Sequence, residues 1–193
     1  PELQKALQLP KTWYERLNIS SDKDLWLASM GIYIFNRKTI LELLDNAQTD
    51  FGKHIIPGAI QTHKLSSYVF QGYWEDVGTI KAFFEANLDL TSLVPKFNFF
   101  DMQSPVFTRP RFLPASKVNG GDIAQSLLSD GCIVQGARLK DCMLGIRSIV
   151  GADADLEEVV MMGGDFYESQ DSIEQSEVQG CPRIGIGSGT TVR

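Results

Sequence analysis

The segment Gly72-Tyr73-Trp74-Glu75-Asp76-Val77-Gly78 places two adjacent carboxylates in a turn-like stretch bounded by glycines. Carboxylate oxygens are ligands that Mg²⁺ prefers in proteins, and a bound Mg²⁺ can hold the oxygens of a phosphate group. Glu75 should project to a different side of the backbone from its neighbour, and Asp76 is the better candidate ligand. The alternative for Asp76 is that it caps the helix that follows.

Ser29 is the second candidate, because its hydroxyl stands two residues before Gly31 in an apolar segment, 25–35. A hydroxyl on a strand beside a glycine can donate to a sugar or phosphate oxygen. The alternative is a small residue packed inside the strand.

The elements that must position these residues alternate between strand and helix signals. Strands are predicted over 25–35 and 65–70, and helices over 2–9, after Asn36 and from Thr79. This alternation indicates a mostly parallel sheet, at whose strand ends ligands bind.

The stretch 92–117 differs in composition from the segments before it. Its prolines exclude regular elements and its aromatic residues are dense, so we expect an extended but packed linker. It carries Arg109, Arg111 and Lys117, and guanidinium groups suit bidentate capture of phosphate. The alternative is that these arginines form salt bridges across a domain junction.

A repeat of 16 residues begins after this linker. It aligns Ile123 with Leu139, Leu128 with Leu144, and Ile133-Val134 with Ile149-Val150, and a slip of one residue then aligns Leu139 with Leu156 and Leu144 with Met161. This spacing predicts three short strands per coil of a parallel β-helix. Corner turns are expected at five glycines: Gly121, Gly131, Gly136, Gly145 and Gly151.

The polar stretch 167–180 interrupts the repeat and is predicted to be a loop thrown out of the coil. The repeat resumes at Ile184-Gly185-Ile186-Gly187. Because a β-helix is not expected to end on an open coil, we expect further coils beyond Arg193.

The composition narrows the class of protein. A formal net charge of −6 argues against broad attraction to nucleic acid or to an anionic membrane. The chain has neither a long apolar run nor a signal-peptide pattern, so it is expected to be soluble and unsecreted. The three cysteines lack CxxC spacing and are expected to be reduced.

Several segments in this order resemble glucose-1-phosphate adenylyltransferase, also called ADP-glucose pyrophosphorylase. They are WLASMGIYIF (26–35), DFGKHIIP (50–57), GYWEDVGTIKAFFEANLDL (72–90), FTRPRFLPASK (107–117) and the glycine-rich repeat with its insert around Asp165-Phe166-Tyr167-Glu168. The resemblance implies an α/β fold: the C-terminal part of a Rossmann-like nucleotidyltransferase domain (1–91), a linker (92–117) and an incomplete left-handed parallel β-helix (118–193).

The resemblance also implies an activity, the transfer of an adenylyl group from ATP to glucose 1-phosphate with Mg²⁺, in glycogen or starch synthesis. Asp76 matches the catalytic, metal-holding carboxylate and Ser29 the serine that contacts glucose 1-phosphate. Arg111, with Arg109 at a more variable place, matches an allosteric anion site for phosphorylated metabolites or phosphate. Such proteins form homotetramers or heterotetramers in the cytoplasm or, in plants, the plastid.

Parts of that family's pattern are not in this sequence. The glycine-rich phosphate loop, the second metal-binding aspartate and a sugar-phosphate lysine are expected before Pro1, so the chain alone is expected to be inactive. His54 stands where the family often has an acidic residue.

Alternatives remain open at this point. The chain is also compatible with a sugar-1-phosphate nucleotidyltransferase that uses another base, or with a non-catalytic regulatory subunit. A hexapeptide acyltransferase is disfavoured, because His54 and His63 lie outside the coils.

Overall fold

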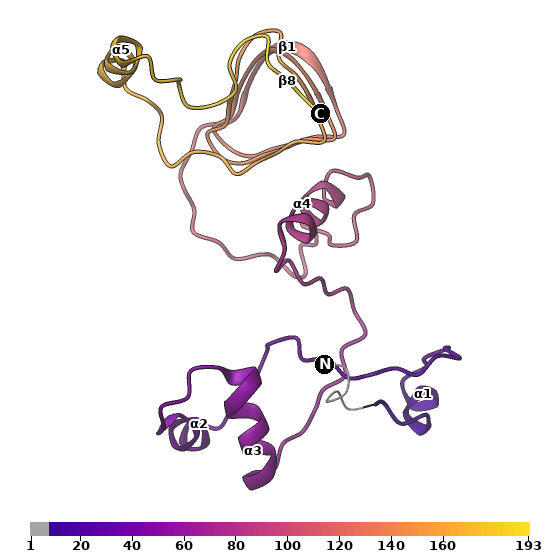
Figure 1. The fold of residues 1–193 in the computed structure, drawn as a ribbon. Coiled ribbons are helices and arrows are strands. Elements are labelled where there is room, and N and C mark those ends of the chain that lie inside the picture. Colours follow the sequence, from indigo (N-terminus) through magenta and orange to yellow (C-terminus); the bar gives the residue numbers. More distant parts are fainter. Residues whose placement is uncertain (1–7) are drawn as a thin grey trace. The chain divides into compact units, whose positions relative to one another are not determined.

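The computed structural model describes residues 8–193, which fall into two units, Pro1–Phe70 and Gln71–Arg193. Most of the helix predicted over 2–9 lies outside the described residues, and Gln8 and Leu9 are not helical. Figure 1 labels the elements of both units.

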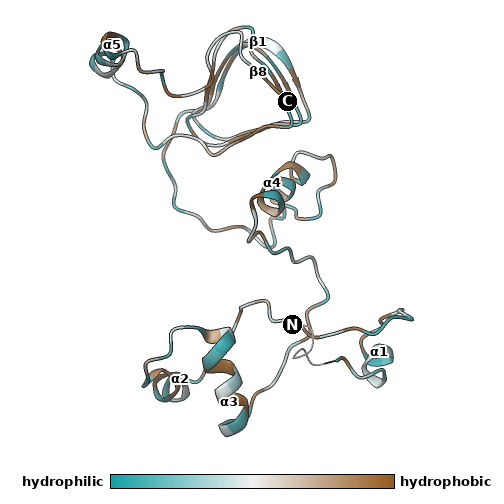
Figure 2. Cartoon of the chain, in the orientation of Figure 1, coloured by the Kyte–Doolittle hydropathy of each residue, from teal (hydrophilic) through white to brown (hydrophobic). Residues whose placement is uncertain are grey.

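The first unit is helical. It contains α1 (Thr12–Arg16), α2 (Arg37–Leu44), a π-helical turn η2 (Phe51–Ile55) and α3 (Ile56–Thr62). Helices α2 and α3 each carry hydrophilic and hydrophobic residues (Figure 2). Helix α2 follows Asn36, as predicted, whereas α1, η2 and α3 were not predicted.

The first unit has a small core and few long-range polar contacts. Leu9, Tyr14, Ile55 and Ala59 are its buried apolar residues. The Tyr14 hydroxyl donates to the Lys23 carbonyl at 3.1 Å and accepts from the Leu25 amide at 3.0 Å. These bonds tie α1 to the chain segment that follows it.

The strands predicted over 25–35 and 65–70 are absent. Between residues 8 and 116 the structure has no strand, and its backbone pairing between segments is an isolated antiparallel bridge, Gln8 to Trp26. Ile32 and Ile34 are 73% and 98% exposed. An apolar segment becomes a strand only when a neighbour pairs its amides and carbonyls, and this unit offers no such neighbour.

The second unit begins with α4 (Ile80–Asp89), which is the helix predicted from Thr79. The Thr79 side chain accepts from the Ala82 amide at 3.1 Å and so caps this helix. Helix α4 contacts strand β7 (Val160–Met161) of the β-helix.

The linker has no helix or strand from residue 91 to 116, as its prolines predict. Its aromatic side chains differ: Phe97 and Phe99 pack edge to face with ring centres 5.1 Å apart, whereas Phe100, Phe107 and Phe112 are 81%, 91% and 92% exposed. Packing of the linker against both domains stays a prediction.

The remaining strands form a parallel β-helix whose coils outline a triangle in Figure 1. They are β1 (Lys117–Ala124), β2 (Leu127–Leu128), β3 (Ile133–Lys140), β4 (Met143–Leu144), β5 (Ile149–Val150), β6 (Asp155–Glu157), β7 and β8 (Thr191–Val192). One sheet has the order β1-β3-β6-β8, with β5 also on β3, and the other has the order β2-β4-β7.

The register of these sheets confirms the predicted repeat. Ile123 pairs with Leu139 and Leu139 with Leu156, so the slip from 16 to 17 residues occurs where the sequence places it. The other predicted pairs are also in register: Leu128 with Leu144, Ile133 with Ile149, Val134 with Val150, and Leu144 with Met161. The inward side chains consequently stack in columns, and Val134, Leu139, Leu144, Val150 and Leu156 are fully buried.

Left-handed backbone conformations mark three corners of each coil, and each recurs at the repeat spacing. The columns are Gly120, Gly136, Asp153 and Gly189; Gln125, Asp141 and Glu158; and Gly131, Arg147 and Gly163, all with positive φ. Two of the five predicted corner glycines, Gly131 and Gly136, lie in these columns.

The other three glycines serve a different purpose. A Cβ at Gly121, Gly145 or Gly151 would lie 2.2, 2.4 or 2.6 Å from a backbone atom of a neighbouring coil. All three positions require glycine because two backbones approach closely there, and Gly121, at φ +109°, also adopts a backbone conformation that favours glycine.

An insert leaves the coil after β7 and returns before β8, as the polar stretch predicts. It also contains a helix that was not predicted, α5 (Gln170–Gln179). The Ser169 side chain caps its start by accepting from the Ser172 amide at 3.2 Å, and Gly180 at φ +68° ends it.

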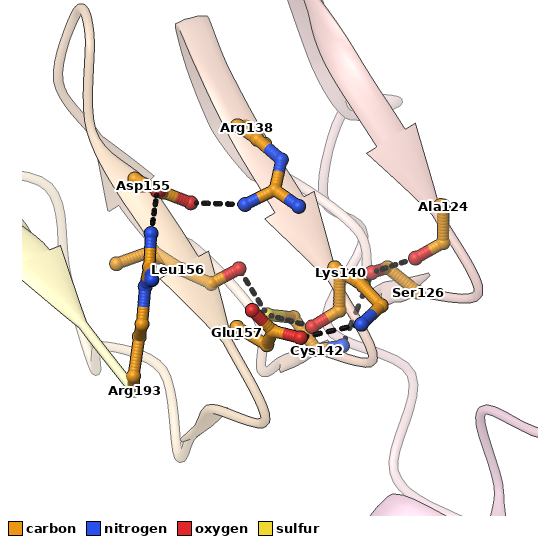
Figure 3. A network of polar contacts seen from close by, with 9 residues as sticks. All are labelled: Ala124, Ser126, Arg138, Lys140, Cys142, Asp155, Leu156, Glu157 and Arg193. Carbon is orange, nitrogen blue, oxygen red and sulfur yellow. Dashed lines mark hydrogen bonds and ion pairs between the residues drawn. The ribbon is translucent and has the colours of Figure 1, made fainter.

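Charged side chains form a ladder on the outer face of β3 and β6 and at Arg193, directly after β8 (Figure 3). Asp155 accepts from Arg138 and from Arg193, each at 2.8 Å, and Lys140 pairs with Glu157. The hydrogen bond from Arg193, followed by that from Arg138, lowers the pKa of Asp155 below its ordinary value of 3.8. The hydrogen bond from Lys140 lowers the pKa of Glu157 below 4.5.

These lowered pKa values predict an acid-dependent loss of stability. A carboxylate whose pKa is lower in the folded state stabilises the fold above its unfolded pKa, and that contribution disappears as the pH falls through the folded pKa. We expect the melting temperature of the β-helix, followed by far-UV circular dichroism, to fall more steeply below about pH 4 in the wild type than in Asp155→Asn. Equal slopes would contradict this. The effect should be small and weaken with salt, because the ladder is partly exposed.

The three cysteines are free, as predicted, and Cys132 and Cys142 are buried inside the coil. Burial raises the pKa of both thiols, which keeps them protonated and unreactive. None of the helices in residues 8–193 has the length and apolar character needed to cross a membrane.

Candidate functional site

Asp76 lies exposed just before α4, in backbone without regular structure, where its side chain forms an Asx turn with the residue two positions on. Its Oδ1 accepts a hydrogen bond from the Gly78 amide at 3.1 Å. The residue that caps α4 is Thr79, so the alternative role for Asp76 as the helix cap is not the one observed. The turn fixes one carboxylate oxygen and leaves Oδ2 available to a ligand.

Glu75 lies in different surroundings from Asp76. It lines an apolar hollow of about 290 Å³ together with Tyr73, Trp74, Val77, Ala86, Leu90 and Phe97, and Asp76 is not part of that lining. The neighbouring carboxylates therefore do not converge on one point, as the alternation of side chains along an extended backbone implies.

Ser29 is exposed in backbone without regular structure instead of a strand, and its side chain forms a turn with the residue two positions on. Its Oγ shares a hydrogen bond with the Tyr33 hydroxyl at 2.8 Å and accepts from the Gly31 amide at 3.1 Å. Gly31 has a φ of +73°, which favours glycine there. Ser29 is consequently neither on a strand nor packed inside one, and its hydroxyl is oriented at the surface by two local partners.

Arg109 and Arg111 are both exposed on the linker, and the structure places them together. Nη1 of Arg111 donates to the carbonyl of Arg109 at 2.9 Å. Neither guanidinium forms an ion pair within residues 8–193, so the alternative of a salt bridge across the junction is not seen there. The remaining N–H groups of Arg111 point to an anion-binding capacity.

These candidates are divided between the two units. Ser29 belongs to the first unit, whereas Asp76, Arg109 and Arg111 belong to the second. His54 lies in η2, and His63 follows α3 with its Nδ1 at 2.8 Å from the Thr62 hydroxyl. Neither histidine is near the coils in sequence, and residues 117–193 contain none.

The described residues around Asp76 offer a metal ion only part of a ligand set. Within the described chain no group of three or more His, Cys, Asp or Glu side chains gathers to hold one. Mg²⁺, however, is often bound by one or two carboxylates with water and substrate phosphates as its other ligands. The free oxygen of Asp76 fits that role.

Two known families match this chain, one on either side of the linker segment 93–110. Residues 13–92 match the nucleotidyl transferase family, and residues 111–193 match the GLGC left-handed parallel β-helix domain. The chain joins a nucleotidyl transferase domain to a GLGC-type β-helix.

The nucleotidyl transferase match contains Ser29 and Asp76, and the GLGC-type match begins at Arg111. Together they confirm the predicted fold class and the left hand of the coil, and they support a nucleotidyl transferase of the ADP-glucose pyrophosphorylase type. The roles of the individual residues remain predictions.

Proposed function

We propose that the protein carrying this chain transfers an adenylyl group from ATP to glucose 1-phosphate, releasing pyrophosphate and ADP-glucose for glycogen or starch synthesis. The observation that supports this proposal is the order of the two family matches, a nucleotidyl transferase over 13–92 and a GLGC-type β-helix over 111–193. The choice of ATP and glucose 1-phosphate as substrates rests on the resemblance of the motifs around Ser29 and Asp76 to glucose-1-phosphate adenylyltransferase.

In this proposal the residues of this chain position the sugar phosphate and Mg²⁺, and none of them forms a covalent bond to the substrate. The Ser29 hydroxyl, oriented by Gly31 and Tyr33, donates to an oxygen of the sugar phosphate. Asp76, held by the Gly78 amide, presents its free oxygen to Mg²⁺. When bound, Mg²⁺ supplies positive charge that offsets the negative charge of the phosphates.

The test is pyrophosphate release by the full-length protein with glucose 1-phosphate and Mg²⁺, offered ATP, UTP or GTP at equal concentration. We expect ATP to give the highest kcat/KM. Preference for UTP or GTP would identify a related enzyme for another base. Release from none of the nucleotides would favour the regulatory subunit.

Arg109 and Arg111 form the proposed anion site for a phosphorylated metabolite or inorganic phosphate. Both are exposed and free of ion pairs in the described chain, which leaves their charge to an effector. We also propose that the protein works as a homotetramer or heterotetramer in the cytoplasm or plastid, which its native mass and cell fractionation would test.

Arg111→Ala should shift the response to an effector more than it changes turnover without one. Loss of one bidentate phosphate contact should raise the concentration of effector needed for half-maximal response by about tenfold. The measurement is initial rate against concentration of inorganic phosphate. Lys96→Ala, which removes a cation already paired with Asp89, is the control. An unchanged response curve would leave Arg111 with a structural role.

A further inference from the structure

A recess of about 490 Å³ lies on the outer face of the β-helix, where the insert returns to the coil. Its lining comes from three segments that are far apart in the sequence: the end of the linker, the strands β1, β3 and β5, and both ends of the insert. The residues are Pro114, Ala115, Lys117, Gly131, Cys132, Ile133, Ile149, Tyr167, Glu168 and Arg183. This volume lies within the usual range of small-molecule sites.

The floor of the recess is apolar. Val134 and Val150 are fully buried inside the coil, so their neighbours Ile133 and Ile149 face outward. In the register of the sheet, Lys117 is the partner of Ile133 on the next coil. The outward pair Ile133 and Ile149 gives the recess an apolar surface that an apolar body can contact.

The wall of the recess is held by bonds at the start of the insert. The Tyr167 hydroxyl donates to the Gly131 carbonyl at 2.7 Å. A Cβ at Gly131 would lie 2.3 Å from that hydroxyl oxygen and would displace it, and the φ of +75° at this position also favours glycine. The guanidinium of Arg147 lies 5.9 Å from the centre of the Tyr167 ring and donates to the Gly164 carbonyl at 3.2 Å.

The charge of the recess is positive on a chain of net charge −6. Glu168, whose side chain is 6% exposed, pairs with Arg183 at 3.5 Å and accepts from the Ile184 amide at 3.2 Å. This pairing orients Arg183 and uses the single acidic group in the lining. Lys117 forms no ion pair within residues 8–193, so its ammonium group remains uncompensated beside the isoleucines.

We propose that this recess binds a small organic anion, in which a phosphate or carboxylate group is attached to an apolar or ring-shaped body. Lys117 and Arg183 would bind the anionic group, while Ile133, Ile149 and the Tyr167 ring contact the body. The site is separate from Asp76 and from the pair Arg109 and Arg111, which do not line it. It also joins the linker to the insert, so binding stabilises both against the coil.

The experiment uses phenyl phosphate as the probe and inorganic phosphate as its bare-anion counterpart, titrated calorimetrically into the full-length protein. We expect phenyl phosphate to bind more tightly than inorganic phosphate. Lys117→Gln should weaken phenyl phosphate by about tenfold, as expected for one lost charge-assisted contact. Lys38→Gln is the matched control, because Lys38 carries the same charge on an exposed helix of the other unit and its replacement should change nothing.

A second variant tests whether the apolar floor of the recess contributes to binding, and it leaves the charged residues unchanged. Ile133→Asn should weaken phenyl phosphate several-fold and leave inorganic phosphate unchanged, and circular dichroism checks that the coil remains folded. Equal affinity for the two probes, or an affinity for phenyl phosphate that Lys117→Gln does not change, would overturn the proposal. Because binding is measured without turnover, these outcomes do not depend on the proposed adenylyl transfer.

Discussion

Asp76→Asn should lower kcat for pyrophosphate release by about 10²–10³-fold, with folding unchanged. The substitution keeps the size of the side chain and an oxygen that can accept from the Gly78 amide, which Oδ1 does at 3.1 Å in the wild type. What it removes is the negative charge that Mg²⁺ requires. The measurement is steady-state kinetics of the full-length protein across a Mg²⁺ titration.

Glu75→Gln provides the control for Asp76. It removes the same charge from the adjacent residue, which lines an apolar hollow instead of sharing the Asp76 surroundings. We expect a change of less than about tenfold in kcat and no shift in the Mg²⁺ requirement. If the two variants lose activity equally, or if Asp76→Asn remains fully active, Asp76 is not the metal ligand.

The second large effect concerns stability. Leu144→Ala should lower the free energy of unfolding of the β-helix by about 2–5 kcal/mol. Leu144 is fully buried, with Leu128 above it and Met161 below it in one column. Backbone hydrogen bonds hold neighbouring coils at a fixed spacing, so the structure cannot collapse into the cavity that the substitution leaves.

Leu128→Ala is the matched control for Leu144→Ala, because it makes the same change in the same column at the first coil. Leu128 is only partly buried, so part of the space it leaves opens to solvent. Urea denaturation followed by far-UV circular dichroism should show a smaller loss for Leu128→Ala than for Leu144→Ala. Losses of equal size would contradict the view that the inner coil is the stability centre.

The strand pairing of the β-helix could be predicted from the sequence because the spacing of its apolar residues specifies the register. Each inward side chain must stack on its counterpart one coil away, so a shift of 16 or 17 residues that aligns Ile123, Leu139 and Leu156 already specifies which strands pair. Corner positions were harder to identify, since Gln125, Asp141 and Glu158 also adopt the left-handed conformation. A non-glycine corner has no distinctive residue type to reveal it.

Elements that depend on local contacts could be predicted, whereas those that depend on distant partners could not. Thr79 predicted the start of α4 because a cap is a contact between residues three positions apart. The apolar segment 25–35 predicted a strand that the structure lacks, because a strand depends on partners from elsewhere in the chain. Ser29 is accordingly positioned by Gly31 and Tyr33, two neighbours in a turn, and not by a sheet.

The sequence by itself determined the turn that presents Asp76, the linker arginines and the coil with its register. Each of these depends on short-range contacts or on a strict period. The tertiary structure alone decided that Lys117, Ile133, Tyr167 and Arg183 line one recess. Lys117 and Arg183 line the same recess because the insert folds back onto the coil, where Tyr167 donates to the Gly131 carbonyl. That contact joins residues 36 positions apart, and no local pattern encodes it.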